Sequence, residues 1–176
     1  MHPGLRAPAH YNEGMLGLRY AYVLALVVWL GGMELLGTVV APTTFGVLQA
    51  QNPADGRALA GAVFGSTLAR FHWIACGAAG VLLVSLSLIA IIGPRPAAFG
   101  RRIAIIVAML VLSLYSGLKV GPRVEALRTQ SLVLPSALPS GDARRVEFDR
   151  LHQLSTWLMT ITMAGGLVLL YWEAQE

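Results

Sequence analysis

Apolar residues along the chain fall into four long blocks that are separated by short polar stretches. The blocks cover residues 20–41, 71–92, 103–120 and 151–172. Each block is close to the ~20 residues that an α-helix needs to cross about 30 Å of hydrocarbon. Continuous apolar runs of this length predict transmembrane helices rather than the core of a soluble domain.

The helices are expected to run beyond these blocks. Pro42 can bend a helix without ending it, and apolar residues continue to Leu48. The segment 52–56 predicts a turn, and residues 140–142 predict the N-terminal cap of the last helix. We therefore expect one domain over residues 1–176, with spans at about 18–48, 58–92, 101–121 and 143–173.

The amino-acid composition is typical of a membrane protein and bears on which partners the chain could bind. Hydrophobic residues make up 56% of the chain, charged residues 12%, and the mean hydropathy is +0.64. The net charge of +4 could suggest a nucleic-acid partner, but the basic residues are spread over short connections and form no basic arm. We expect membrane lipid as a partner, together with other membrane subunits or a second copy, and no nucleic acid.

The chain resembles itself at a shift of 80 residues. The matching pairs are Gly37 and Gly117, Val40 and Val120, Pro42 and Pro122, Arg70 and Arg150, and His72 and His152. The alternative is a chance alignment of apolar segments, but histidine and proline are scarce here, with 4 and 9 copies. We expect an all-α integral membrane four-helix bundle built from two similar helical hairpins, with a pseudo-two-fold axis along the membrane normal.

Most polar residues within the predicted spans lie towards the side that carries the first and third loops. The candidates for a ligand site there are Glu34, Arg70, His72, Lys119, His152 and Ser155. Glu34 is the most informative, because it lies about 12 Å inward from Pro42 at 1.5 Å per helical residue. A carboxylate at that depth must be paired, neutralised or hydrated, so we expect it to face the bundle interior beside a polar partner.

Two further features suggest alternative roles. His72 and His152, at matched depth, could ligate haem b or a metal ion, although histidines near a membrane surface more often serve as hydrogen-bonding groups. Glycines in the second and fourth blocks predict close approach of helices within the bundle. These glycines are Gly77, Gly80, Gly165 and Gly166.

Several short motifs of the chain resemble those of a known family. They are the segments 29–32, 41–42, 60–64, 115–117, 122–123 and 148–155. Together these motifs resemble an uncharacterised bacterial four-span family, a domain of unknown function related to a eukaryotic transmembrane protein linked to platinum-drug resistance. Its Leu-His-x-x-Ser signature corresponds to Leu151, His152 and Ser155. The resemblance implies the four-span fold and supplies no catalytic residues, and a looser likeness to copper-resistance and haem-pathway membrane proteins keeps metal or haem binding open.

The sequence favours a protein that is not an enzyme. Its residues do not assemble a nucleophile with a base, a phosphate-binding loop or a pair of catalytic carboxylates. We therefore expect an accessory or scaffolding bundle that packs against other membrane helices, located in the bacterial inner membrane. The alternatives are a haem or metal protein that uses His72 and His152, and passage of a small solute or ion past Glu34.

Overall fold

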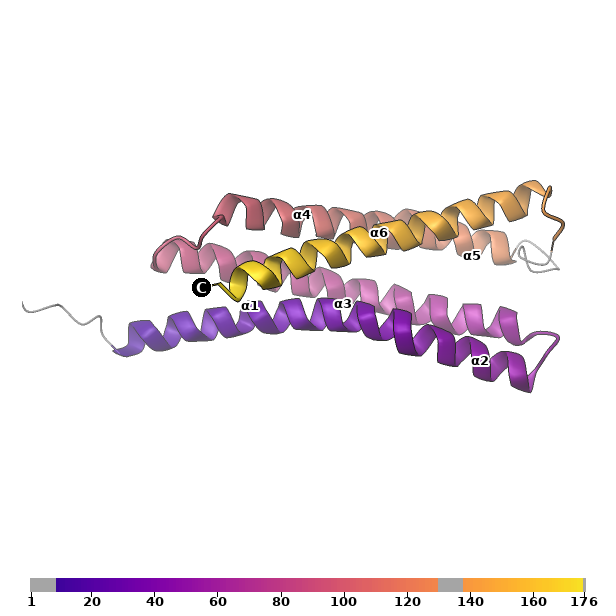
Figure 1. Ribbon diagram of the computed structural model, residues 1–176, viewed down its shortest axis with the longest axis horizontal. Helices are drawn as coiled ribbons and strands as arrows, with labels where there is room; N and C mark the ends of the chain where they lie inside the picture. The colour runs from indigo at the N-terminus through magenta and orange to yellow at the C-terminus, as the bar shows by residue number, and fades with distance from the viewer. Residues whose placement is uncertain (1–8, 130–137, 176) are drawn as a thin grey trace, which may run out of the picture.

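The computed structural model describes residues 9–129 and 138–175, so residues 1–8, 130–137 and 176 of the predicted domain lie outside the described residues. Within the described ranges all regular structure is helical. In chain order the elements are α1 (Ala9–Leu35), η1 (Leu36–Val40), α2 (Ala41–Gln51), α3 (Gly56–Ile92), α4 (Phe99–Tyr115), η2 (Ser116–Val120), α5 (Gly121–Thr129) and α6 (Ala143–Glu173). The α1–η1–α2 and α4–η2–α5 segments are each one long, locally distorted helix, and the predicted all-α four-helix bundle is confirmed (Figure 1).

Each long helix packs beside two others. α1 contacts α3 and α6, and α4 contacts the same two helices, so the four helices form an up-and-down square. The beginning of α1, the α3–α4 connection and the end of α6 lie at one end, called here the terminal end (Figure 1). The α2–α3 turn and the α5–α6 connection lie at the other end, called here the loop end (Figure 1).

Large apolar side chains from all four helices fill the centre. Trp29 of α1, Leu82 of α3, Ile106 of α4 and Leu169 of α6 are each 0% exposed. Burying side chains of this size contributes about 1.5–3 kcal/mol each in water, whereas within a bilayer the same contacts stabilise the bundle mainly through close packing. The core therefore depends on how well these side chains fit together.

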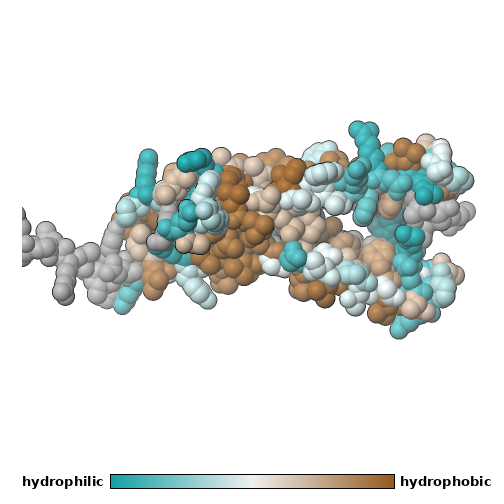
Figure 2. Space-filling view, viewed as in Figure 1, coloured by the Kyte–Doolittle hydropathy of each residue, from teal (hydrophilic) through white to brown (hydrophobic). Residues whose placement is uncertain are grey.

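The helices are longer than a membrane is thick. Within residues 9–129 and 138–175, four helices are long and apolar enough to cross a bilayer, and the chain is an integral membrane protein. α3 contains 37 residues, which correspond to about 55 Å at 1.5 Å per residue, against about 30 Å of hydrocarbon. Figure 2 shows apolar side chains over the middle of the molecule and hydrophilic side chains towards both ends, especially the loop end. The bundle therefore projects out of the membrane at the loop end.

The N-terminus of α6 is capped as the sequence predicts. A carboxylate oxygen of Asp142 accepts a hydrogen bond from the backbone N–H of Arg144 at 2.8 Å, and the guanidinium of Arg144 donates to the same carboxylate at 3.1 Å. The side-chain bond from Arg144, followed by its backbone bond, lowers the pKa of Asp142 from its ordinary value. This cap fixes the first turn of the helix that carries the chain back into the membrane.

Lowering the pH is expected to loosen this cap. Because the pKa of Asp142 is lower in the folded protein than in the unfolded chain, its stabilising effect is present above about pH 4 and is lost as the pH falls further. Asn caps a helix about as well as Asp and does not titrate. Hydrogen exchange in residues 143–147 should therefore accelerate more steeply between about pH 5 and pH 3 in the wild type than in Asp142→Asn. Identical profiles for the two proteins would contradict this role of Asp142.

Candidate functional site

Both long interrupted helices change to π-helical geometry at corresponding positions. η1 covers Leu36–Val40 and η2 covers Ser116–Val120, which are separated by the 80-residue shift seen in the sequence. Pro42 and Pro122 follow in the first turn of the next α-helix. Proline has no N–H and its ring clashes with the carbonyl four residues earlier, so a locally widened helix accommodates it. The shared distortion supports the duplication, while superposition of the whole hairpins stays a prediction.

The contacts made at the two π-helical segments differ. A Cβ atom on Gly117 would lie 2.8 Å from Cδ2 of His72, so the His72 ring packs directly on η2. The corresponding residue of the first hairpin, Gly37, lies instead beside the methyl group of Met159, at 3.2 Å from an added Cβ. The repeat therefore preserves the backbone distortion but not the side chain that packs on it.

The six residues predicted to form a ligand site differ in exposure. Glu34, Arg70, Lys119 and His152 are exposed, and His72 and Ser155 are partly buried. Arg70, Lys119 and His152 belong to α3, η2 and α6 respectively. Ligand binding by this set stays a prediction.

Glu34 does not face the bundle interior, and that prediction is wrong. Its neighbours on the inward face, Trp29 and Met33, are 0% and 6% exposed and fill the interior side of α1. Glu34 follows Met33 by one residue, or about 100° around the helix, and lies on the outer surface. Within the described part of the chain no side-chain hydrogen bond or ion pair to its carboxylate is found, and Thr38 Oγ1 donates to the backbone oxygen of Glu34 instead, at 2.7 Å.

The two candidate metal-binding histidines have different environments. Nδ1 of His72 lies 2.8 Å from the carbonyl oxygen of Leu68 and donates its proton there, because a carbonyl oxygen can only accept. The ring of His152 stacks on Phe148 of its own helix, with centroids 6.3 Å apart. Among the described residues, no three His, Cys, Asp or Glu side chains come together in a group that could hold a metal ion.

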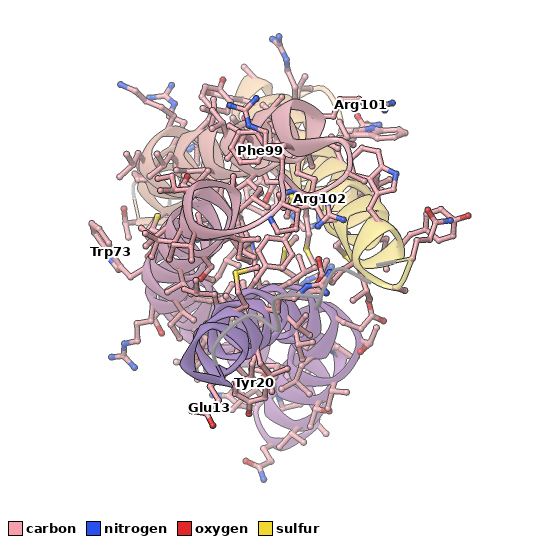
Figure 3. All side chains as sticks on the ribbon, turned by 90° about the vertical axis from the view of Figure 1, so that its left-hand side faces the viewer. Glu13, Tyr20, Trp73, Phe99, Arg101 and Arg102 are labelled. Carbon is pink, nitrogen blue, oxygen red and sulfur yellow. The ribbon has the colours of Figure 1, made fainter. Side chains whose placement is uncertain are left out.

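A buried charge network at the terminal end was not anticipated from the sequence. The guanidinium of Arg102 is 1% exposed and donates to a carboxylate oxygen of Glu173 at 2.7 Å. Nε of Arg19 lies 3.4 Å from the other oxygen of the same carboxylate. Viewed from this end, Arg102 points into the bundle and Arg101 points outward (Figure 3). The network joins α1, α4 and α6, so it holds three of the helices together at the terminal end.

At the loop end, Arg128 of α5 connects the two hairpins. Its guanidinium donates to the carbonyl oxygen of Ala58 on α3 and to the carboxylate of Glu125 at 3.1 Å. A Cβ on Gly61 would lie 2.8 Å from this guanidinium, so the absent side chain at Gly61 makes room for it. The loop-end parts of α3 and α5 are thus held together by Arg128.

The outer surface between α1 and α3 contains an apolar groove of about 290 Å³. Its walls are formed by Ala21, Leu24, Ala25, Val28, Ile74, Gly77, Ala78 and Val81. A Cβ atom added to Gly77 or to nearby Gly80 would meet nothing within 4 Å, whereas one on Gly166 would overlap Leu30. Close approach within the bundle is therefore found at Gly166 and at neighbouring Gly165, but the prediction is wrong for Gly77 and Gly80, which are open to the outside.

Comparison with known proteins finds a family model that matches more than half of the chain. A family model described as "Domain of unknown function (DUF4149)" matches residues 24–133, which extend from α1 through α5. No curated protein and no solved structure that was compared matches the chain. This match confirms the predicted resemblance to a family whose function is unknown.

Proposed function

The chain belongs to the DUF4149 family of domains of unknown function, and we propose that it is a non-enzymatic accessory bundle that packs against another membrane helix. The groove between α1 and α3 is the observation that carries this proposal. We further propose, from the resemblance to a bacterial four-span family, that it resides in the bacterial inner membrane.

The glycines beside the groove favour a helix as its occupant. Glycine in a helix interior costs about 1 kcal/mol relative to alanine, and Gly77 and Gly80 make no close internal contact that would require the missing side chain. In bilayers, small residues on a helix surface allow a second backbone to approach closely. Ile74 and Val81 lie on either side of Gly77 along α3 and would bracket such a helix.

The alternative functions receive less support from the geometry. His72 packs against η2 and His152 stacks on Phe148, so neither is oriented by the other. Glu34 lies on the outer surface rather than along an internal path. Docking of a helix in the groove is compatible with the observed positions of the two histidines and of Glu34.

Filling the groove is expected to weaken docking. With a photo-crosslinking amino acid at Val81, we expect a discrete protein adduct in intact membranes, and its mass distinguishes a second copy from another subunit. Gly77→Leu fills the groove and should lower the adduct yield about tenfold, the effect of losing one good interhelical contact. Ala108→Leu introduces the same side chain at an exposed position of α4 outside the groove and should leave the yield unchanged.

Two results would contradict the docking proposal. One is crosslinking at Val81 to lipid alone, which would mean that acyl chains occupy the groove. The other is an equal adduct yield in the wild type, Gly77→Leu and Ala108→Leu.

A further inference from the structure

The terminal end of the bundle contains a hollow of about 330 Å³ between α1 and the α3–α4 connection. Its walls are Met15 and Arg19 of α1, Ile89 of α3 and residues 94–97 of the connection. Met15 and Arg19 precede the buried Tyr22 and Leu26 at spacings of four and three residues, so all four lie on the inward face of α1. The hollow therefore continues the bundle interior at its terminal end, and its size falls within the range of small-ligand sites, about 300–1,000 Å³.

The charge lining this hollow is positive. Two of its wall residues are Arg19 and Arg95, and among the described residues no carboxylate lines it. Arg95 is exposed and makes no ion pair within the described part of the chain. Arg19 contacts the carboxylate of Glu173, but the same carboxylate is bound at 2.7 Å by the buried Arg102. Glu13, the other acidic residue described at this end, points away from the bundle (Figure 3).

The surroundings of Arg95 constrain its position. Pro94 and Pro96 flank it, and each proline ring fixes the backbone angle φ near −65°. The guanidinium lies over the Phe99 ring, 5.8 Å from the ring centroid. A group that is held in place before binding loses less conformational freedom when a ligand arrives. The planar guanidinium matches two oxygens of a phosphate group, which makes phosphate the anion that best fits this hollow.

The level of the hollow relative to the membrane follows from the charges along α3. The part of this helix without charged residues, 71–92, is about 33 Å long at 1.5 Å per residue, against about 30 Å of hydrocarbon. The hydrocarbon must therefore end close to Ile92 at the terminal end. Arg95 follows three residues later, and each headgroup layer is about 5–8 Å thick. Lipid phosphates thus lie at the level of the Arg95 guanidinium.

We propose that this hollow binds the phosphate of an anionic phospholipid headgroup, with Arg95 and Arg19 as the groups that contact it. Basic pockets between transmembrane helices at the membrane surface bind such headgroups. The hollow lies on the inward face of α1, whereas the docking groove lies on the outer surface between α1 and α3. This is therefore a second site, beyond the proposed docking function.

The test counts lipids bound to the full-length protein in uncharged detergent micelles by native mass spectrometry. The probes are phosphatidylglycerol, phosphatidylcholine with the same acyl chains, and glycerol phosphate in solution. We expect phosphatidylglycerol to bind about tenfold more tightly than phosphatidylcholine, because its headgroup carries no cation that opposes the arginines. Glycerol phosphate should bind more weakly than phosphatidylglycerol, because it is not concentrated at the membrane surface.

Two substitutions of Arg95 and a matched control make this test specific. Arg95→Gln should weaken the binding of phosphatidylglycerol about tenfold, the effect of losing one charge-assisted contact. Arg95→Lys keeps the charge but loses the planar fork, so it should weaken binding by about threefold. Arg101→Gln removes the same charge from an exposed residue at the same end, outside the hollow, and should leave binding unchanged. Thermal unfolding of each variant without added lipid checks that the bundle is intact.

Three results would overturn this inference. Equal effects of Arg95→Gln and Arg101→Gln would mean that anionic lipid is attracted by the overall charge of this end and not by the hollow. Equal affinity of the wild type for the two lipids would show that the hollow does not select an anionic headgroup. Glycerol phosphate that binds as tightly as phosphatidylglycerol and depends on Arg95 would assign the hollow to a soluble phosphate ester instead of a lipid.

Discussion

Replacing Arg102 by alanine is expected to destabilise the bundle by about 3 kcal/mol, because it removes one partner of a buried ion pair. Arg102 is 1% exposed, and its 2.7 Å contact compensates the carboxylate of Glu173, which is 13% exposed. After the substitution that carboxylate keeps the longer contact with Arg19, at 3.4 Å. The loss should appear as a lower midpoint of thermal unfolding in detergent micelles.

The neighbouring Arg101 provides a matched control. Its guanidinium lies over the Trp172 ring, 5.6 Å from the ring centroid, and its side chain is exposed. A cation–π contact at an exposed site contributes about 0.5–1 kcal/mol, so Arg101→Ala should cost much less than Arg102→Ala. Replacing both members of the buried pair, as in Arg102→Leu with Glu173→Leu, should recover part of the lost stability. Equal effects of Arg101→Ala and Arg102→Ala would contradict a structural role for the buried pair.

The spans could be predicted from the sequence because hydrocarbon imposes a strong constraint on a chain. Every backbone polar group in a bilayer must be bonded internally, so a long apolar run becomes a helix. The predicted span at residues 143–173 corresponds to α6, Ala143–Glu173, and the predicted cap at Asp142 is present. The spans and the cap depend on short stretches of sequence, so they can be predicted without knowledge of the tertiary contacts.

The direction in which each polar side chain points could not be predicted in the same way. Glu34 was expected inside because a polar partner there would lower its cost, yet the large apolar side chains of Trp29 and Met33 occupy that side of α1. The exposed carboxylate of Glu34 shows that the cost of a charge in an apolar segment does not by itself fix the direction in which the side chain points.

Arg102 shows the opposite error, since the basic residues were assigned to the short connections between helices, whereas Arg102 is buried in the bundle. It shares one helix face with Ile106 and Met109, which follow at spacings of four and three and are 0% and 2% exposed. That spacing is visible in the sequence and could have placed Arg102 in the core. Its carboxylate partner is 71 residues away, and nothing local identifies Glu173 as that partner.

The hairpin turn between α2 and α3 contains a glycine that the packing requires. Gly56 is buried, and its N–H donates to the carbonyl oxygen of Asn52 at 2.7 Å. A Cβ added to Gly56 would overlap the carbonyl oxygen of Leu48 and lie 2.8 Å from Cα of Gln49. These are backbone atoms, which cannot rotate away as the end of a flexible side chain can. The turn must open to accept any side chain at this position.

Gly56→Ala is therefore expected to destabilise the loop end by about 2 kcal/mol, within the range for overpacked sites. Gly46→Ala is the matched control, because Gly46 lies in the interior of α2 and an added Cβ meets nothing within 4 Å. That control should stabilise α2 by up to about 1 kcal/mol through higher helix propensity. Thermal unfolding measures both effects, and hydrogen exchange over residues 48–59 should accelerate only in Gly56→Ala. Equal exchange in the two variants would show that the turn accepts a side chain, and the packing argument for Gly56 would then fail.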